Sequence, residues 1–325
     1  MSPAAPRATR PGHGRTWAKA ILLGEHSVVY GHPAVALPLH DLEMTATVTP
    51  TAGPSWLHSL GYDGPLREGG PRFACIARAL EAAREFSGLL GQSFRIETRS
   101  DFPHERGLGS SAAAAGAIIR AVLDSCGRSA TMEELLALTH MAEQVAHDRP
   151  SGLDAAATSA PAPIRFQSGE MRPLAQRIAG GHIVIADSGV HGSTREAVRG
   201  LRLRYEASPA VLGPKLQHLG DLTTTATHAL DTGDAPLLGA AMNEAHTTLG
   251  ELGLSLPVLD RLTDAARGAG ALGAKLTGGG LGGCVIALAA GAEPAARVRQ
   301  ALDDVGARRT WIYRMRTSQT ARNAS

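Results

Sequence analysis

The sequence contains few cysteines and no long apolar run. No stretch approaches the roughly 18 consecutive apolar residues of a membrane-spanning helix, so we expect no membrane segment. Cys75, Cys126 and Cys284 lie far apart and fit no zinc-binding pattern, and no His-x-x-x-His pair occurs among the 13 histidines. We therefore expect reduced thiols, a cytoplasmic location and no bound zinc.

A strong excess of charge of either sign is also missing. The formal net charge is +2, with 32 basic and 30 acidic residues, which gives no electrostatic case for a nucleic acid or an anionic membrane as partner. The Gly-x-Ser-x-Gly turn of serine hydrolases is absent as well. With 19% charged and 43% hydrophobic residues, the composition is that of an ordinary globular protein.

Lysine is scarce: Lys19, Lys215 and Lys275 are the three lysines among the 32 basic residues. A compact ammonium differs chemically from a guanidinium, so lysines kept in an arginine-rich chain are candidates for function, although drift explains Lys215 equally well. Lys19 occupies an apolar strand context. It could stabilise developing negative charge, or it could extend from the strand end to water.

At 325 residues, the chain is long enough for two domains. Residues 1–15 lack an apolar core and so are no secretory signal; we expect a disordered tail, with a transit peptide as the alternative. We expect an N-terminal domain over 16–185 and a C-terminal domain over 186–325. Both should mix strands and helices.

Hydrophobic periodicity and turn residues predict the main elements. A capping box at Thr131–Glu134 opens one of the helices, which should run to about residue 147. The expected strands are 16–23, 28–39 with a break at 31–33, 44–49, 182–186, 274–277 and 284–289, with a polar connection over 51–71. The expected helices are 73–85, a helix from the glycine loop to about 127, several between 190 and 270, and 294–305.

Residues 103–113 (PHERGLGSSAA) form a glycine loop that runs through two serines into an alanine-rich helix. Glycines permit close approach of the backbone, and free N–H groups at a helix N-terminus attract anions, so the segment predicts a phosphate site. A plain loop with a serine helix cap is the alternative. The lysine of a Walker A loop is absent, and no buried strand directly precedes the loop as a dinucleotide fingerprint requires.

Two carboxylates follow this loop. Glu143 falls on a partly apolar helix face, where a carboxylate is either paired or a metal ligand. Asp154 comes eleven residues later, after a Pro-Ser-Gly turn. One could hold Mg²⁺ while the other accepts a proton from an attacking hydroxyl, although Asp154 could instead cap the next helix.

Two further segments carry polar groups or many glycines. Glu25 and His26 lie at a turn, where they could bind a polar substrate or face solvent. Thr277 precedes a loop of six residues, 278–283, five of them glycine. That composition is entropically costly for a simple hairpin, so we expect it to reflect close approach to a ligand.

Together these segments resemble the GHMP small-molecule kinases and, within them, the mevalonate kinases. Three motifs appear in order: 19–36 (KAILLGEHSVVYGHPAVA), 107–113 (GLGSSAA) and 275–284 (KLTGGGLGGC). Residues 150–154, 187–196 and 242–255 add likeness to the mevalonate branch. The resemblance implies an α+β two-domain fold, with an N-terminal α/β domain of the ribosomal-protein type and a ferredoxin-like C-terminal domain.

The resemblance also implies roles for residues. Asp154 matches the catalytic aspartate, Lys19 the lysine beside the reacting hydroxyl, and Ser111 and Glu143 the Mg²⁺ ligands. ATP is the co-substrate, mevalonate the acceptor, and a homodimer acting in isoprenoid synthesis is expected. Substrate contacts fall to Lys19, Glu25, His26, Asp154, Thr277 and Gly278. ATP contacts fall to Pro103, His104, Glu105, Arg106, Gly107, Leu108, Gly109, Ser110, Ser111, Ala112 and Ala113.

Two departures from the family pattern stand out. Trp17-Ala18 precedes Lys19 where the family often has Pro-Gly, and residues 104–106 (HER) replace small residues in the phosphate loop. Glu105 would bring negative charge towards ATP unless Arg106 offsets it. Neither change removes a group that the mechanism requires.

Other activities on the same fold stay open. A kinase for phosphomevalonate, homoserine or a sugar would share the phosphate site and differ where Glu25, His26 and residues 187–196 meet the acceptor. The decarboxylase relative is disfavoured by the combination of Lys19 with Asp154. A non-catalytic ligand sensor would be expected to lose Lys19, Asp154 or Glu143, and all three are present.

Overall fold

The computed structural model describes residue 8 and residues 10–145, 151–192 and 194–317. The chain forms two compact units. The first contains the described residues up to 18 together with 39–104, 109–145 and 151–159; the second contains 19–38, 105–108 and the described residues from 160 onward. The expected division at 185/186 differs from this, because residues 19–38, 105–108 and 160–185 belong to the second unit.

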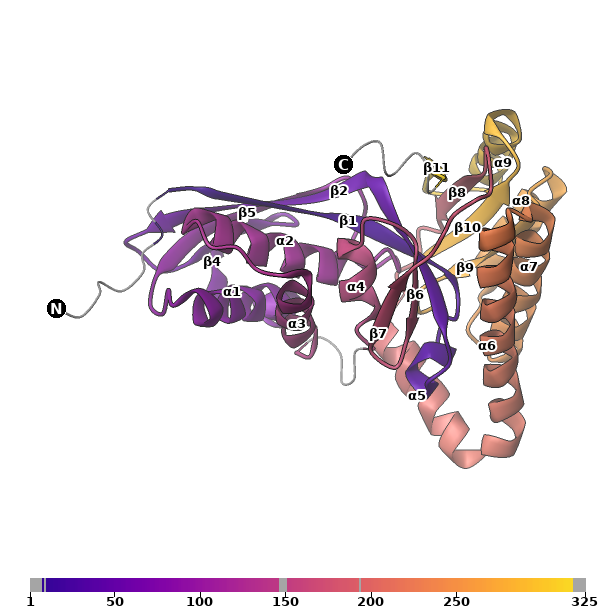
Figure 1. Cartoon of the computed structure of the whole chain (residues 1–325), viewed down its shortest axis with the longest axis horizontal. Helices are drawn as coiled ribbons and strands as arrows, with labels where there is room; N and C mark the ends of the chain where they lie inside the picture. Colours follow the sequence, from indigo (N-terminus) through magenta and orange to yellow (C-terminus); the bar gives the residue numbers. More distant parts are fainter. Residues whose placement is uncertain (1–7, 9, 146–150, 193, 318–325) are drawn as a thin grey trace. The chain divides into compact units, whose positions relative to one another are not determined.

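The first unit is a sheet covered by helices on one face (Figure 1). Its strand order is β4-β3-β5-β2, with β1 paired to β2; β3 and β5 are parallel. The strands are β1 (Gly12–Leu23), β2 (Ala34–Thr51), β3 (Trp56–Ser59), β4 (Tyr62–Pro65) and β5 (Ser93–Ser100). The helices are α1 (Ala74–Ser87), α2 (Ser110–Ser125), α3 (Met132–Glu143) and α4 (Leu153–Ser159), with short 3₁₀ turns η2 (Leu66–Glu68) and η3 (Pro71–Phe73).

Small side chains place α2 against the sheet. The alanines of its first two turns are buried, and Thr16 Oγ1 of β1 donates a hydrogen bond of 2.7 Å to Ala113 O. Because alanine adds little bulk and loses no side-chain entropy, this stretch favours a helix that lies close to its strand. The position of the α2 N-terminus is thereby fixed.

The second unit contains a four-stranded antiparallel sheet in the order β11-β8-β10-β9. The strands are β8 (His182–Asp187), β9 (Gly273–Thr277), β10 (Cys284–Ala289) and β11 (Arg309–Arg314). Numbered in chain order, they lie 4-1-3-2, with helices between the first and second and between the third and fourth. This is the ferredoxin-like arrangement that the sequence predicts.

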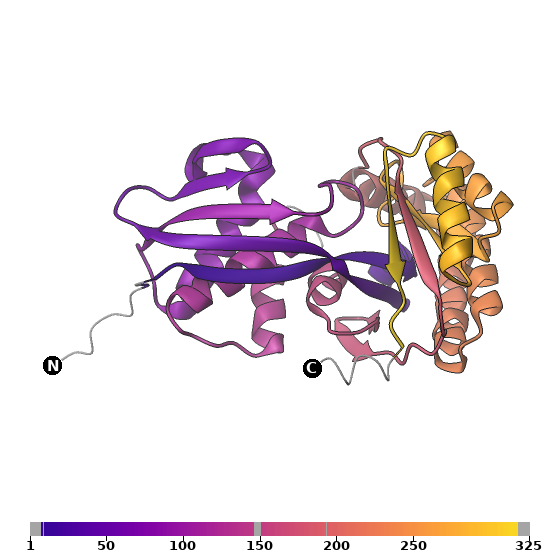
Figure 2. The ribbon, with the colours of Figure 1, turned by 90° about the horizontal axis from the view of Figure 1, so that it is seen from above.

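Helices cover one face of this sheet (Figure 2). Helices α7, α8 and α9 pack against its strands, and α6 packs against α7. The helices are α5 (Thr194–Ala207), α6 (Pro209–Thr232), α7 (Ala235–Glu251), α8 (Pro257–Gly268) and α9 (Ala292–Asp304). The same unit holds the 3₁₀ helix η1 (Ser27–Tyr30), the start of β2, and β6 (Ile164–Gln167) and β7 (Glu170–Pro173).

Several expectations need correction. β1 begins at Gly12, so residues 12–15 of the expected tail are strand; residues 1–7 and 9 lie outside the described residues. Residues 28–30 are 3₁₀ helix, and 34–51 form one strand rather than two. The polar connection over 51–71 contains β3 and β4, and β11 was not expected. β11 is only six residues long and closely follows α9, so hydrophobic periodicity gave little signal for this strand.

Other expectations hold. The capping box at Thr131 is formed with Glu134, and α3 begins directly after it. α3 ends at Glu143, and residues 146–150, through which the expected helix would have run, lie outside the described residues. The three cysteines are free thiols. Across the ranges given above, no helix combines the length and apolar character needed to cross a membrane.

Candidate active site

Lys19 and Lys275 are among the largest fully buried side chains of the chain. Lys19 belongs to the part of β1 that lies in the second unit, beside the loop 105–108. Its Nζ donates to Gly107 O at 3.0 Å, and its backbone N–H donates to Leu108 O at 3.0 Å. A buried ammonium must be compensated by hydrogen bonds and charge. The carbonyl of Gly107 supplies part of this compensation, and it ties Lys19 to the predicted phosphate loop at residues 103–113.

Glu25 and Lys275 form a buried ion pair in the same unit. Neither side chain is exposed to solvent, and Lys275 Nζ donates to Glu25 Oε1 and, at 2.6 Å, to its neighbour's carbonyl, Leu276 O. Burial raises the pKa of Glu25, while Lys275 and Lys19 act in the opposite direction. Burial likewise lowers the pKa of Lys275, and Glu25 opposes that shift. Glu25 is therefore paired inside the protein rather than facing solvent.

His26 lies next to this pair and is also buried. Its Nε2 hydrogen-bonds to Gly279 O at 2.9 Å, and its backbone has a φ of 61°, which L-residues rarely adopt. Desolvation lowers its pKa to about 4, so the ring is neutral at pH 7. A neutral ring that donates from Nε2 presents Nδ1 as an acceptor.

Thr277, the last residue of β9, uses its hydroxyl to connect β9 with β1. Its Oγ1 accepts a hydrogen bond from Ile21 N at 2.9 Å and donates to Ile21 O at 3.1 Å. The side chain is 1% exposed. Its hydroxyl therefore holds the strand that carries Lys19 against the strand that carries Lys275.

The glycines of loop 278–283 allow backbone segments of the protein to approach one another. A Cβ on Gly278 would lie 2.7 Å from Gly107 Cα, and one on Gly280 would lie 2.3 Å from Leu254 O. The sequence predicted close approach of this loop to a ligand, and the structure shows a further reason for its glycines. Tight packing against neighbouring loops requires residues that have no side chain at these positions.

Arg106 is held in a buried ion pair with Asp187. Its Nε lies 2.9 Å from Asp187 Oδ1, and its Nη2 donates to Gly189 O at 3.3 Å. Glu105 is exposed and lies 3.3 Å from His191 Nδ1. The question left open by the sequence, whether Arg106 offsets Glu105, is answered by the ion pair: Asp187 holds the guanidinium in the interior. With the Arg106 and Leu108 side chains buried, the loop can offer a nucleotide only backbone groups at these two positions.

In the first unit, the phosphate loop continues into α2. Gly109 occupies the position before the helix with a φ of 75°, and no side chain caps this end. Ser110 and Ser111 are the first two helical residues, so the alternative of a serine cap is wrong. The first N–H groups of a helix have no acceptor within it, and here they adjoin two hydroxyl groups.

Ser111 and Glu143 are brought together around Cys75 of α1. Cys75 Sγ lies 3.9 Å from Ser111 O, and the charge of Glu143 acts on the same thiol. Burial, more than Glu143, raises the pKa of Cys75 to about 12. Glu143 is the last residue of α3 and is 2% exposed. The Ser111 backbone and the charge of Glu143, from different helices, therefore both act on Cys75 near the α2 N-terminus.

Asp154 is the second residue of α4, which packs against α2 and α3. Its position inside the first turn contradicts the alternative that it caps the helix. Its carbonyl accepts a hydrogen bond of 2.9 Å from Thr158 Oγ1. Ser151 Oγ accepts from Leu153 N at 3.2 Å and helps start the helix. Of the expected substrate contacts, Lys19, Glu25, His26, Thr277 and Gly278 lie in the second unit and Asp154 in the first.

Sequence reasoning gave no role to Lys275, Asp187 or Cys75. Lysine scarcity singled out Lys275, but nothing local to the sequence pairs it with Glu25, 250 positions away. Asp187 drew notice only as part of a family-like segment. Long-range ion pairs of this kind leave no periodic signal.

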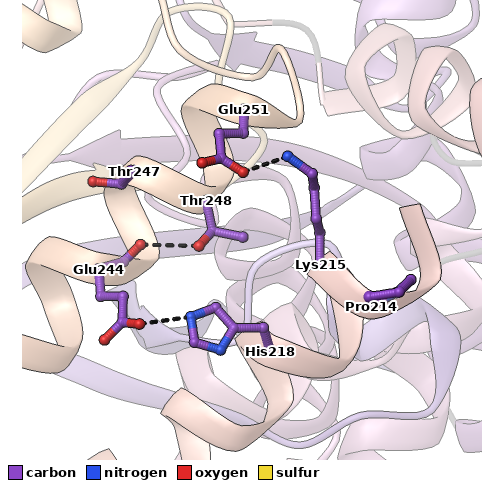
Figure 3. Close-up of a pocket in the computed structure, with 7 residues that line it drawn as sticks. All are labelled: Pro214, Lys215, His218, Glu244, Thr247, Thr248 and Glu251. Carbon is purple, nitrogen blue, oxygen red and sulfur yellow. Dashed lines mark hydrogen bonds and ion pairs between the residues drawn. The ribbon is translucent and has the colours of Figure 1, made fainter. Parts of the chain in front are cut away.

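A separate hollow of about 330 Å³ lies between α6 and α7 (Figure 3). Its charged groups pair with one another: Lys215 with Glu251, and His218 Nε2 with Glu244 Oε1 at 2.9 Å. Lys215 is thus a surface residue in a self-compensated cluster. None of the expected site residues lines this hollow.

Comparison with known proteins places this geometry in a family. The family model described as the GHMP kinases N terminal domain matches residues 74–160, and that of the GHMP kinases C terminal domain matches 226–308. A mevalonate kinase of Thermococcus gammatolerans is 33% identical over 293 residues, covering 84% of this chain and 87% of the relative. A mevalonate kinase of Pyrococcus horikoshii is 33% identical, covering 85% and 88%.

Solved structures show the same fold. The structure of mevalonate kinase from methicillin-resistant Staphylococcus aureus is 28% identical with a TM-score of 0.71, covering 94% of this chain and 99% of that one. The structure of L. major mevalonate kinase in complex with R-mevalonate has a TM-score of 0.80 at 24% identity, covering 98% and 99%. The α+β fold predicted from the sequence is confirmed. The chain belongs to the GHMP kinase family.

Proposed function

We propose that this kinase transfers the γ-phosphoryl group of ATP to the C5 hydroxyl of mevalonate, giving 5-phosphomevalonate and ADP in isoprenoid synthesis. The names of its relatives at 33% identity support the acceptor. The observation that carries the chemistry is the buried Lys19 ammonium, bonded to the carbonyl of Gly107 in the phosphate loop. This places a fixed positive charge beside the loop that would hold the transferred group.

In the proposed reaction, Asp154 orients the C5 hydroxyl and accepts its proton as the oxygen attacks phosphorus. Lys19 stabilises the negative charge that develops on that oxygen. Because phosphoryl transfer passes through a loose transition state, positioning and electrostatics outweigh the strength of the base. The proposal therefore requires Lys19 and Asp154 to meet at one hydroxyl when both substrates are bound.

The phosphates would bind at residues 103–113, where the backbone N–H groups at the start of α2 attract negative charge. Ser111 and Glu143 fit a Mg²⁺ ion, since a hydroxyl and a carboxylate are the hard oxygen donors that it prefers. Among the residues that the structure describes, no three His, Cys, Asp or Glu side chains gather as a metal cage. The remaining ligands would be phosphate oxygens and water, as is usual for Mg²⁺, which when bound would neutralise charge on the phosphates.

Glu25, His26, Thr277 and Gly278 would form one wall of the acceptor site in this proposal. Their side chains are buried and bonded to the protein. We therefore propose that these residues set the shape and charge of the acceptor site and make little direct ionic contact with the acceptor. A homodimer and a cytoplasmic location complete the proposal, on the family resemblance and the free thiols.

The test of the mechanism is Asp154→Asn. We expect kcat with mevalonate to fall by about 10²–10⁴-fold, the range for loss of a general base, while Tm stays within a few degrees of the wild-type value. Lys19→Met should act similarly. Near-normal turnover in the Asp154→Asn protein would remove this carboxylate from the mechanism.

The acceptor is tested with the wild-type protein. ADP release is measured with mevalonate, phosphomevalonate, homoserine and galactose at matched concentrations. We expect kcat/KM for mevalonate to exceed the others by at least about 10²-fold, since buried polar groups discriminate strongly against ill-fitting substrates. A higher value for another acceptor would reassign the substrate and leave the kinase family unchanged.

A further inference from the structure

Lys275, the buried lysine to which the mechanism gives no task, lies in a cluster of three charges. Lys19 is 2% exposed, and Glu25 and Lys275 are not exposed at all. The electrostatic influence of Lys19 reaches both other groups. We call these three residues the buried charge cluster. Its formal charges sum to +1 when all three are ionised.

The contacts of the buried charge cluster are unequal. Lys275 Nζ is bound to Glu25 Oε1 and to Leu276 O, whereas Lys19 Nζ is bound to Gly107 O. The Glu25 carboxylate thus forms its ion pair with Lys275. Lys19 donates to the carbonyl of Gly107.

Two buried ammonium groups compete for one buried carboxylate. Opposite charges attract strongly in a medium of low dielectric constant, so a buried carboxylate that loses its partner either takes up a proton or attracts another buried cation. For ionised Glu25 we infer that this cation is Lys19, whose charge already acts on it. The ammonium would then be drawn from Gly107 O towards Glu25, away from the position where the mechanism uses it.

We propose that Lys275 is a positioning residue: by occupying Glu25, it keeps the Lys19 ammonium on the phosphate loop and available to the reacting oxygen. This inference rests on the proposed role of Lys19. Lys275 is the first residue of the motif 275–284, so the inference gives that motif a function besides the packing of its glycines. Lys275 itself touches no reacting atom.

The first experiment is Lys275→Met, with Lys215→Met as the matched control. Lys215 is also ion-paired, but it lies on α6 beside the hollow of Figure 3 and does not belong to the buried charge cluster. We expect kcat to fall by about 10–100-fold in the Lys275→Met protein, because a misplacement of about 1 Å can cost about 10²-fold. The Lys215→Met protein should keep its wild-type kcat.

The second experiment separates positioning from stability. Glu25→Gln combined with Lys275→Met removes the competing carboxylate as well as its partner, so Lys19 should return to Gly107 O. We expect kcat at saturating acceptor to rise above that of the Lys275→Met protein, although KM for the acceptor also rises because Glu25 lines the proposed acceptor site. Failure of kcat to recover in a folded double variant would overturn the proposal.

A pH profile gives a readout that a purely structural role would not move. Glu25 faces Lys19 and Lys275, and Lys275 in turn faces His26 and His246, with Arg204 acting on His26. In the Lys275→Met protein, protonation of Glu25 at lower pH should release Lys19, so its kcat relative to wild type should rise from pH 8 to pH 5.5. A constant ratio would contradict positioning.

The closing experiment is a crystal structure of the Lys275→Met protein, or of Lys275→Gln if the former does not fold. Glutamine, like methionine, removes the positive charge that occupies Glu25, but it keeps a side chain that can hydrogen-bond. Lys19 Nζ bonded to Glu25 would support the proposal, and Lys19 Nζ still on Gly107 O would overturn it. Because this arm needs no turnover, it stands even if the wild-type protein fails to phosphorylate mevalonate.

Discussion

The two glycine-containing segments, 103–109 and 278–283, differ in composition and in how they use their glycines: the first has two glycines in seven residues and the second five in six. The first ends at the α2 N-terminus, where the left-handed Gly109 leads into Ser110 and Ser111 with no side-chain cap. The second is buried against other loops, with Gly278 against Gly107 and Gly280 against Leu254. The first segment thus ends in helix N–H groups that have no acceptor within the helix, whereas the second is used for packing.

The difference teaches that a glycine-rich loop is not by itself a binding loop. Loop 278–283 holds the segment 105–108 in place, and Lys19 is bonded to the carbonyls of that segment. The second loop therefore supports the first. Substitutions in the two should separate stability from activity.

The largest expected effect is on stability, from Gly280→Ala. Its φ of 72° and a Cβ 2.3 Å from Leu254 O leave no room for a methyl group, so we expect a loss of more than about 3 kcal/mol. Gly270→Ala is the control, because its φ is also positive but nothing lies within 4 Å of its Cβ. It should cost about 1 kcal/mol. Equal losses in urea denaturation would show that packing is not the cause.

The next comparison sets Ser111→Ala against Thr277→Val. The Ser111 hydroxyl belongs to the proposed phosphate and Mg²⁺ site, so its loss should lower kcat by about 10²-fold and leave Tm unchanged. The Thr277 hydroxyl makes two buried hydrogen bonds to Ile21, so its loss should cost about 1–3 kcal/mol of stability. A stability loss from Ser111→Ala would erase the distinction between the segments.

Acid should destabilise the region around the second loop. Burial lowers the pKa of both His26 and His246 to about 4, and the ring of His246 accepts a hydrogen bond from Leu276 N at 3.3 Å. Because the unfolded chain binds these protons near pH 6.5, stability is complete above that pH and falls as the pH drops towards 4. We expect a loss of about 2 kcal/mol per histidine between pH 8 and pH 5.

The measurement is the free energy of unfolding in urea at several pH values. His246→Gln keeps a side chain that can hydrogen-bond but cannot titrate, so its stability should depend less steeply on pH than that of the wild-type protein. An unchanged slope would mean that His246 does not contribute.

The smallest effect is expected for Glu105→Gln in the first segment. The side chain is exposed and pairs with His191, so solvent screens its charge. Removing the charge should lower the KM for ATP by no more than about threefold, since exposed charges contribute little. A much larger change would mean that Glu105 faces the nucleotide closely.

Local sequence predicted the elements whose signals are local. The alanines after Ser111 predicted α2, and the Thr131–Glu134 box predicted the start of α3. Residues 28–30 were expected to be strand because Val and Tyr favour it, but the left-handed turn at Gly31 closes them into a 3₁₀ helix. The compact units do not follow the expected boundary at 185/186, because segments far apart in sequence pack into one unit.

The residues of the candidate site likewise divide into those that local sequence marked and those whose partners only the fold revealed. The three motifs marked Lys19, Ser111 and Thr277 as residues of interest, because small residues around a lone polar group are unusual. They could not show that Arg106 pairs with Asp187 instead of offsetting Glu105, or that Glu25 pairs with Lys275. Ion pairs depend on which strands become neighbours, and that is a property of the whole fold.

By itself, the sequence determined the starts of α2 and α3, a helix end that could receive phosphate, and which lysines are uncommon enough to matter. Only the tertiary structure decided that Lys275 pairs with Glu25 and that Lys19 donates to the carbonyl of Gly107. The physical reason is range: backbone propensity acts over a few residues, whereas the burial of a charge depends on side chains that arrive from distant parts of the chain.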